Sequence, residues 1–82
     1  MAYCRLGDDC DLYCYSGLYD DGREFYFLRV AHRAAAAAGD ITDDYYEHGI
    51  EALAARLEFL RARGVRFPGT VLDEARADLE GG

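Results

Sequence analysis

The stretch "CDLYCYSGLYDDGREFYFLRV", residues 10–30, predicts two strands joined by a tight turn. Both arms are rich in aromatic, β-branched and other apolar side chains, which suit a pleated and partly buried surface. The Asp21–Gly22 pair between them is typical of a two-residue type I′ turn, because that turn needs a positive φ at both central positions. The sequence therefore predicts a β-hairpin in which Asp20 pairs with Arg23.

This register assigns the hairpin side chains to two faces, because successive residues of a strand point to opposite sides. We expect Tyr26 to lie over the space left by Gly17. One face is expected to hold Tyr13, Tyr15, Tyr26, Leu28 and Val30. The other is expected to hold Leu12, Cys14, Leu18, Phe25 and Phe27. Both faces are partly apolar, so one covers the core and the other is either covered too or used for contact.

Residues 44–63 predict the main helix. Asp44 and Glu47 have the spacing of a capping box at its start. Apolar side chains then recur at helical intervals, namely Tyr46, Ile50, Leu53, Leu57 and Leu60. Gly64 is placed to end the helix in a left-handed conformation, with Val65 closing back onto Leu60 as in a Schellman motif.

Residues outside these segments complete the architecture. Residues 2–6 are expected to add an edge strand, and residues 70–80 a C-terminal helix after the break at Pro68. The alanine-rich residues 34–41 allow a short helix or an extended connection, and we expect a connection with at most one helical turn.

The predicted fold class is α+β, a small three-stranded antiparallel sheet followed by a helical hairpin packed on one face. The sheet is expected in residues 1–33, and a chain this short predicts a single domain over residues 1–82.

The amino-acid composition restricts the classes of function to be considered. The 82 residues include sixteen acidic and nine basic side chains, a net charge of −7, and every basic residue is arginine. Direct binding to nucleic acid is disfavoured, because phosphate neutralisation needs a basic stripe. An acidic surface instead attracts basic protein surfaces. With no targeting segment and no apolar run of the roughly 20 residues that span a bilayer, we expect a soluble intracellular protein.

The three cysteines are an odd number and do not suit a secreted disulfide framework. The simplest interpretation is that Cys4, Cys10 and Cys14 pack as small apolar side chains and stay free thiols. A zinc site that uses these cysteines with His32 is an alternative. No nucleophile stands in a recognised catalytic pattern, so we expect no enzyme, no cofactor and no metal.

Carboxylates and tyrosines concentrate in the first half of the chain, where residues 1–50 carry ten acids against four arginines. Turn formation and solubility explain each acidic cluster singly. Tyrosine, however, is enriched at protein interfaces. We therefore predict a partner-binding face composed of Asp8, Asp9, Asp11, Asp20, Asp21, Asp43, Asp44 and Glu47, with Tyr13, Tyr15 and Tyr19 as aromatic anchors.

The opening Tyr3-Cys4-Arg5, the pair Asp8-Asp9 and the run Cys10-Asp11-Leu12-Tyr13-Cys14-Tyr15 together resemble the start of small phage-encoded proteins of unassigned function. Those proteins begin with Y-C-R-W-S, followed by an acidic pair and a C-D-x-Y-x-Y strand, and this chain has Leu6 in place of the tryptophan. The resemblance covers roughly the first third of the chain. It implies an acidic accessory phage protein in the cytoplasm of a bacterial host.

Small acidic phage proteins of this kind often inhibit host defence, and anti-CRISPR proteins are one such class. The leading hypothesis is therefore a non-enzymatic anti-CRISPR protein whose acidic, tyrosine-rich face blocks the DNA-binding surface of a CRISPR surveillance complex. A small phage structural or self-associating protein, as a possible homodimer, is the alternative. A zinc-binding Cys/His module is the second alternative.

Overall fold

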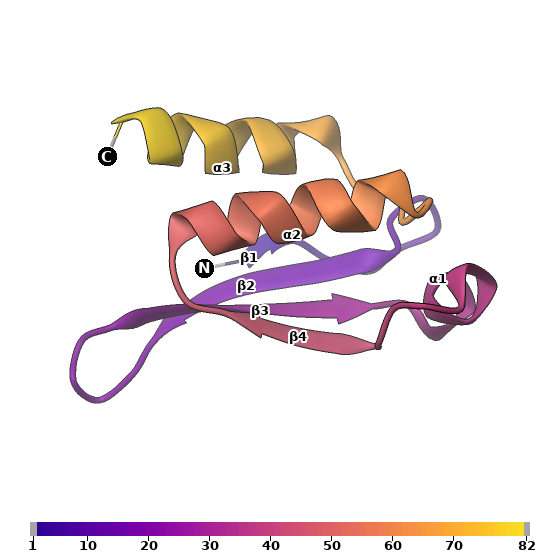
Figure 1. Cartoon of the computed structure of the whole chain (residues 1–82), viewed down its shortest axis with the longest axis horizontal. Helices are drawn as coiled ribbons and strands as arrows, with labels where there is room; N and C mark the ends of the chain where they lie inside the picture. The colour runs from indigo at the N-terminus through magenta and orange to yellow at the C-terminus, as the bar shows by residue number, and fades with distance from the viewer. Residues whose placement is uncertain (1, 82) are drawn as a thin grey trace.

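The structure is a computed structural model that describes residues 2–81, and it is an α+β fold with one sheet and two layers. Four antiparallel strands are hydrogen-bonded in chain order: β1 (Ala2–Cys4), β2 (Leu12–Leu18), β3 (Glu24–Val30) and β4 (Asp44–Glu47). The helices are α1 (His32–Ala38), α2 (Ile50–Ala62) and α3 (Gly69–Gly81). Helices α2 and α3 cover one face of the sheet, and α1 lies at one end of it (Figure 1).

The turn between β2 and β3 differs from the predicted one. The Tyr19 amide donates to the Arg23 carbonyl at 2.8 Å, and the Gly22 amide donates to the Tyr19 carbonyl at 2.9 Å. Gly22 has a φ of 87°. This is a three-residue loop, a type I turn followed by a left-handed glycine, rather than a two-residue type I′ turn. The predicted register was therefore wrong by one residue.

A shift of one residue exchanges the faces of one strand relative to its neighbour. Cys14 pairs with Leu28 and Tyr15 pairs with Phe27, so both predicted face assignments mixed two real ones. Gly17 pairs with Phe25, and Phe25, rather than the expected Tyr26, occupies the space over it. A Cβ at Gly17 would lie only 2.6 Å from Cζ of Phe25, so glycine leaves room for that ring.

The second correction concerns residues 44–63. Residues 44–47 form β4, in which Tyr45 pairs with Leu28 and Tyr46 with Phe27, so the sheet has four strands and not three. Helix α2 begins only at Ile50, after Gly49 with a φ of 116°. The capping box expected at Asp44 and Glu47 does not form, because pairing with β3 satisfies the backbone of this segment and aromatic residues favour strands.

The end of α2 confirms the predicted Schellman motif. The Val65 amide donates to the Leu60 carbonyl at 3.1 Å, and the Gly64 amide donates to the Arg61 carbonyl at 3.0 Å. Gly64 has a φ of 87°, the left-handed conformation that this motif requires. The C-terminal helix predicted for residues 70–80 is likewise present as α3.

The alanine-rich segment is a helix rather than the expected connection. Alanine has the highest helix propensity, and Gly39 ends α1 with a φ of 81° while its amide donates to the Ala35 carbonyl at 3.0 Å. Ala35 is buried, so its small side chain lets α1 pack closely against the end of the sheet.

The core lies between the sheet and the two long helices. Its fully buried large side chains come from β2, β3, α2 and α3: Leu12, Leu28, Val30, Leu53, Leu57, Leu60 and Val71. Among residues 2–81, no helix combines the length and the apolar character needed to cross a membrane.

Candidate functional site

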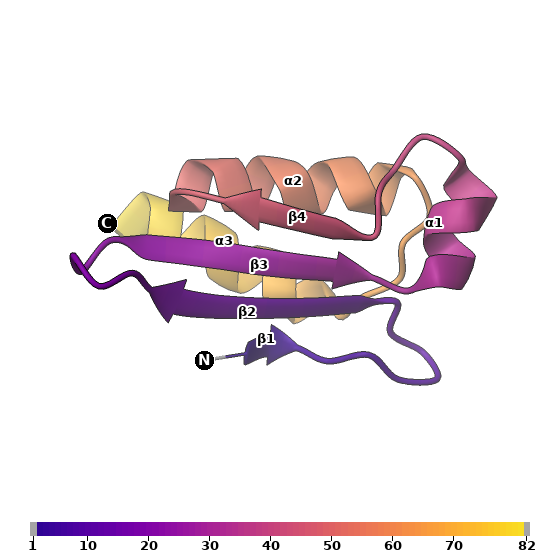
Figure 2. The same ribbon diagram turned by 90° about the horizontal axis from the view of Figure 1, so that it is seen from below.

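Helices α2 and α3 lie on one side of the sheet, and the other face of the sheet is turned away from them (Figures 1 and 2). That other face carries a continuous group of rings. They belong to alternate residues of β2, β3 and β4 and to residues that follow β2 and β4, because alternate strand residues share a side. The buried residues between them point to the core. We call this surface the aromatic face; its members are Tyr13, Tyr15, Tyr19, Phe25, Phe27, Tyr46 and His48.

Ring contacts connect the three strands across the aromatic face. The Tyr46 centroid lies 5.0 Å from that of Phe27 and 6.5 Å from that of Phe25. Tyr13 meets Phe27 edge-on at 6.3 Å, and Tyr19 lies 4.8 Å from Phe25. Offset and edge-on pairs of this kind are favourable, so the rings hold one another in place.

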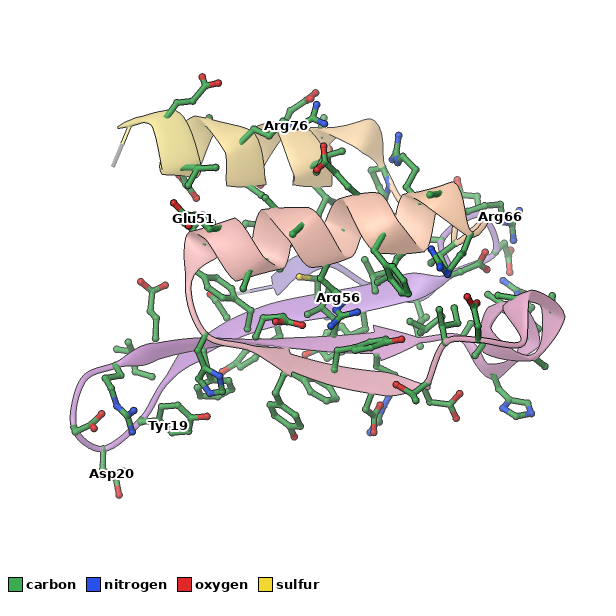
Figure 3. All side chains as sticks on the ribbon, in the orientation of Figure 1. Tyr19, Asp20, Glu51, Arg56, Arg66 and Arg76 are labelled. Carbon is green, nitrogen blue, oxygen red and sulfur yellow. The ribbon has the colours of Figure 1, made fainter. Side chains whose placement is uncertain are left out.

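A polar contact orders the end of the aromatic face nearest the β2–β3 turn. The Tyr19 hydroxyl and Nε2 of His48 lie 2.7 Å apart, and their rings stack at 5.7 Å. Tyr19 belongs to the turn and His48 to the residues after β4, so the contact joins two segments far apart in sequence. Figure 3 shows Tyr19 and Asp20 together on the side of the sheet away from the helices.

The aromatic face is open to solvent. Tyr46 keeps 61% of its surface exposed, while Tyr15 and Tyr19 keep 38% and 37%. Phe25 and Phe27 are only half-buried. Large apolar groups gathered on one exposed surface commonly mark a contact site, whereas single exposed apolar residues do not. The arrangement therefore favours binding over a purely structural role for these rings.

Arginines and carboxylates stand at both ends of the aromatic face. The Arg23 guanidinium lies over the Tyr19 ring at 5.2 Å, and its Nε is 2.6 Å from Oδ2 of Asp21. At the other end, Arg29 lies over Phe27 at 5.3 Å, with its Nε 2.9 Å from Oδ1 of Asp44.

The predicted acidic residues do not form one continuous surface. Asp20 and Asp21 lie in the β2–β3 turn, and Asp43 and Asp44 lie at the opposite end of the sheet, where β4 begins. Seven strand residues separate these ends by roughly 20 Å at about 3.3 Å per residue. Asp8 and Asp9 are exposed in the connection before β2. The structure thus brings together the three predicted tyrosines but divides the predicted acids.

Two predicted acids serve the fold instead of the surface. Asp11 is only 4% exposed, and its carboxylate accepts hydrogen bonds from Arg33 and Arg66. These bonds outweigh its burial and hold its pKa at about 2. Glu47 faces α2, where its Oε1 accepts a bond from Nε of Arg56 at 2.8 Å.

The three thiols gather where β1 meets β2. Cys4 pairs with Cys14 across the strands, and Cys4 and Cys10 both donate to the Leu12 carbonyl, at 3.3 and 3.2 Å. Burial, aided by the neighbouring thiols, raises the pKa of Cys4 to about 12, and burial alone does the same for Cys14. All three are free thiols.

The donor set of the zinc alternative is not assembled. His32 lies at the start of α1 with its side chain 86% exposed and its Nδ1 3.6 Å from Oδ2 of Asp43, whereas Cys10 and Cys14 are buried. Across residues 2–81, no three His, Cys, Asp or Glu side chains form a group that could hold a metal ion.

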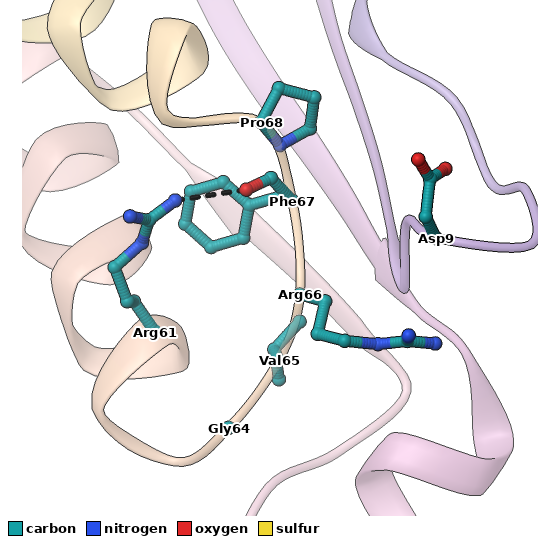
Figure 4. A pocket seen from close by; sticks show the side chains of 7 residues that line it. All are labelled: Asp9, Arg61, Gly64, Val65, Arg66, Phe67 and Pro68. Carbon is teal, nitrogen blue, oxygen red and sulfur yellow. Dashed lines mark hydrogen bonds between the residues drawn. The ribbon is translucent and has the colours of Figure 1, made fainter.

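A shallow hollow of about 500 Å³ lies between the α2–α3 connection and the residues before β2 (Figure 4). Arg61 stacks on Phe67 at 4.5 Å and donates to its carbonyl at 2.9 Å. Arg66 is bound to Asp11, and Asp9 stands on the far wall. Both guanidinium groups of the hollow thus already have partners within the fold, which makes it a weaker candidate than the aromatic face.

Sequence reasoning missed four members of the aromatic face, namely Phe25, Phe27, Tyr46 and His48. The first two were placed on the opposite side from Tyr13 and Tyr15 by the register error, and Tyr46 was placed in a helix. A three-residue loop would have paired Tyr15 with Phe27 and put the rings of both arms on one face. No protein-family model matches the chain, and no curated protein or solved structure matches it either.

Proposed function

We propose that this chain is a non-enzymatic protein-binding module that contacts its partner through the aromatic face. The single observation that carries the proposal is the group of rings in mutual contact on the side of the sheet turned away from α2 and α3. Tyr46 in this group keeps 61% of its surface exposed. Tyrosine offers a large, rigid contact area with a polar tip and loses little side-chain entropy on binding.

Charge indicates the kind of partner. The net charge is −7, and both ends of the aromatic face carry carboxylates. Basic protein surfaces are therefore favoured partners, and carboxylates at the ends would steer them toward the rings. Since the carboxylates flank the rings and do not cover the face, binding energy comes mainly from the rings and only in part from charge.

The resemblance to phage accessory proteins supplies a concrete setting for this proposal. A phage inhibitor of bacterial defence needs a basic host surface to occupy, and the DNA-binding surface of a CRISPR surveillance complex is one. In this proposal the module covers that surface and excludes target DNA, without chemical modification of either partner.

Exposed rings on a four-stranded sheet also suit stacking with single-stranded nucleic acid. Such sites combine the rings with a positively charged groove, however, and the two arginines at the aromatic face are paired with Asp21 and Asp44. The overall negative charge would repel phosphates. A protein partner is therefore the better interpretation.

The test is affinity purification of the tagged full-length protein from a CRISPR-bearing bacterial host, followed by mass spectrometry. We expect the unmodified chain to retain a nucleic-acid-binding protein complex. The double variant Tyr15→Ala and Tyr46→Ala removes two exposed rings and should lower affinity by about tenfold or more, as substitutions of interface tyrosines do. Leu79→Ser, on the exposed side of α3, is the matched control and should bind as the unmodified chain does.

Two results would contradict the proposal. Recovery of no nucleic-acid-binding protein by the unmodified chain would remove the host-complex setting. Equal binding by the double variant would remove the aromatic face as the site. A stable dimer in light scattering that the double variant abolishes would instead show that a second copy of the chain covers these rings.

A further inference from the structure

Arginine stacked on an aromatic ring is a repeated unit of this fold. All nine basic residues are arginine, and five of them lie over rings of the chain itself. The separations between guanidinium carbon and ring centroid run from 3.8 Å for Arg63 over Phe59 to 5.3 Å for Arg29 over Phe27. Arg56 lies over two rings, those of Tyr45 and Phe59.

A carboxylate completes most of these units. Arg56 is 2.8 Å from Glu47, and Arg63 is 2.8 Å from Asp40. The units formed by Arg23 and Arg29 contain Asp21 and Asp44 in the same way. A planar guanidinium can stack on a ring and bind a carboxylate with its edge at the same time, which the compact ammonium group of lysine cannot do.

Arg23 and Arg29 stand at the two ends of the aromatic face, and Arg29 reaches over Phe27, which lies between Tyr15 and Tyr46 in the middle of the face. Within residues 2–81, no arginine stacks on Tyr13, Tyr15 or Tyr46. Tyr46 is nevertheless the most exposed tyrosine of the face. Tyr15 and Tyr46, on either side of Phe27, therefore offer open ring surface between the two arginines.

We propose that the aromatic face binds arginine side chains of the protein partner, stacked over Tyr15 and Tyr46 at its centre and over Tyr13, which lies beside Arg29. This inference rests on the proposed function and names the chemistry that the partner supplies. Asp20 and Asp43, which form no ion pair with an arginine of the described chain, stand at the two ends, where their charge attracts the guanidinium groups of the partner. The net charge of −7 and the preference of stacked sites for arginine over lysine both support this occupant.

The test compares two short unstructured peptides of equal length and charge, one with arginines and one with lysines at the same positions. Binding to the full-length protein is measured by isothermal titration calorimetry at fixed salt. We expect the arginine peptide to bind several-fold more tightly, because both peptides gain the same long-range attraction but only arginine stacks strongly.

Two substitutions of Tyr46 test whether the preference for the arginine peptide arises at the aromatic face. Tyr46→Phe keeps a ring and should keep the preference for the arginine peptide. Tyr46→Leu keeps an apolar side chain without a ring and should lower affinity for the arginine peptide about two- to fivefold, with little change for the lysine peptide. Leu79→Ser is the control outside the face and should change neither affinity.

Equal binding of the two peptides, or loss of affinity in Tyr46→Phe as large as in Tyr46→Leu, would overturn the inference. Neither result would overturn the proposed function if the host complex is still retained in an aromatic-face-dependent manner. Conversely, arginine-selective binding that requires the Tyr46 ring would support the inference even if purification from the chosen host recovers no partner.

Discussion

The buried residue Asp11 forms hydrogen bonds to three parts of the chain. Its side chain accepts bonds from Arg33 in α1 and from the backbone and side chain of Arg66 between α2 and α3. Its own amide donates to the Arg66 carbonyl at 2.6 Å, and its carbonyl accepts from the Ala31 amide at 2.7 Å. Burying a carboxylate without hydrogen-bond partners costs several kcal/mol of free energy, so these bonds hold α1 and the α2–α3 connection against the start of β2.

The low pKa of Asp11 predicts a pH dependence of stability. Its carboxyl has a pKa of about 2 in the folded chain, below the ordinary value of 3.8, because the two arginines stabilise the ionised form. The unfolded chain therefore binds this proton more readily, and the stabilisation is present above about pH 4 and is lost as pH falls toward 2.

We expect Asp11→Asn to lower the free energy of unfolding by about 2 kcal/mol at pH 7, and to flatten its fall between pH 4 and pH 2. Urea unfolding at a series of pH values measures both effects. Asp8→Asn is the control, because the Asp8 side chain is exposed, and it should change stability by less than about 0.5 kcal/mol. A pH dependence in Asp11→Asn equal to that of the unmodified chain would contradict this account.

At the scale of elements, β1 is the least secured strand of the sheet. It is only three residues long and lies at the edge, with β2 as its sole neighbour in the sheet. Its Cys4 thiol is half-buried, whereas those of Cys10 and Cys14 are buried. Short edge strands open more readily than central ones, so local opening would expose Cys4 before the others.

The prediction is that a thiol reagent such as iodoacetamide at pH 8 modifies Cys4 first, and slowly. The thiolate is the reactive form, and a pKa of about 12 leaves very little of it at that pH. Mass spectrometry of timed samples identifies the modified residue. In urea all three cysteines should react quickly, and modification of Cys14 before Cys4 in the folded protein would contradict the assignment of β1 as the strand that opens.

Across the whole molecule, negative charge surrounds the aromatic face and does not concentrate on it. Helix α3, on the opposite side, carries four exposed acids, Asp73, Glu74, Asp78 and Glu80, and its one arginine, Arg76, pairs with Glu58. Long-range attraction of a basic partner therefore comes from the entire surface. Only the carboxylates at the ends of the face are near enough to guide the final approach.

Two matched charge variants separate these contributions. Asp20→Asn with Asp43→Asn and Asp73→Asn with Asp78→Asn change the net charge by the same amount. The first pair should lower the association rate for the arginine peptide more than the second, with similar dissociation rates, since charges near a contact act mainly on encounter. Stopped-flow kinetics at low salt measures both rates. Equal effects of the two pairs would show that only the net charge matters.

Short sequence signals were sufficient to predict those elements whose ends are set by neighbouring residues. The Schellman end of α2 at Gly64 followed from the glycine and its neighbours, and α3 followed from Pro68 and the apolar spacing after it. Gly49 was a signal that could have moved the start of α2, because a glycine inside a helix costs about 1 kcal/mol relative to alanine. The adjacent pair Tyr45–Tyr46 also favoured a strand, because aromatic side chains pack well on a pleated, partly buried sheet.

Thus the amino-acid sequence alone determined the α+β class, the presence of the hairpin, the end of α2 and the presence of α3 after Pro68, because caps, turns and apolar periodicity act between residues near one another in the chain. Tertiary structure decided that residues 44–47 pair with β3, that Asp11 is buried between two arginines, and which rings share the open face. Each of these depends on contacts between segments distant in sequence. A shift of one residue in register, which costs little locally, exchanges every side chain between the core and the surface.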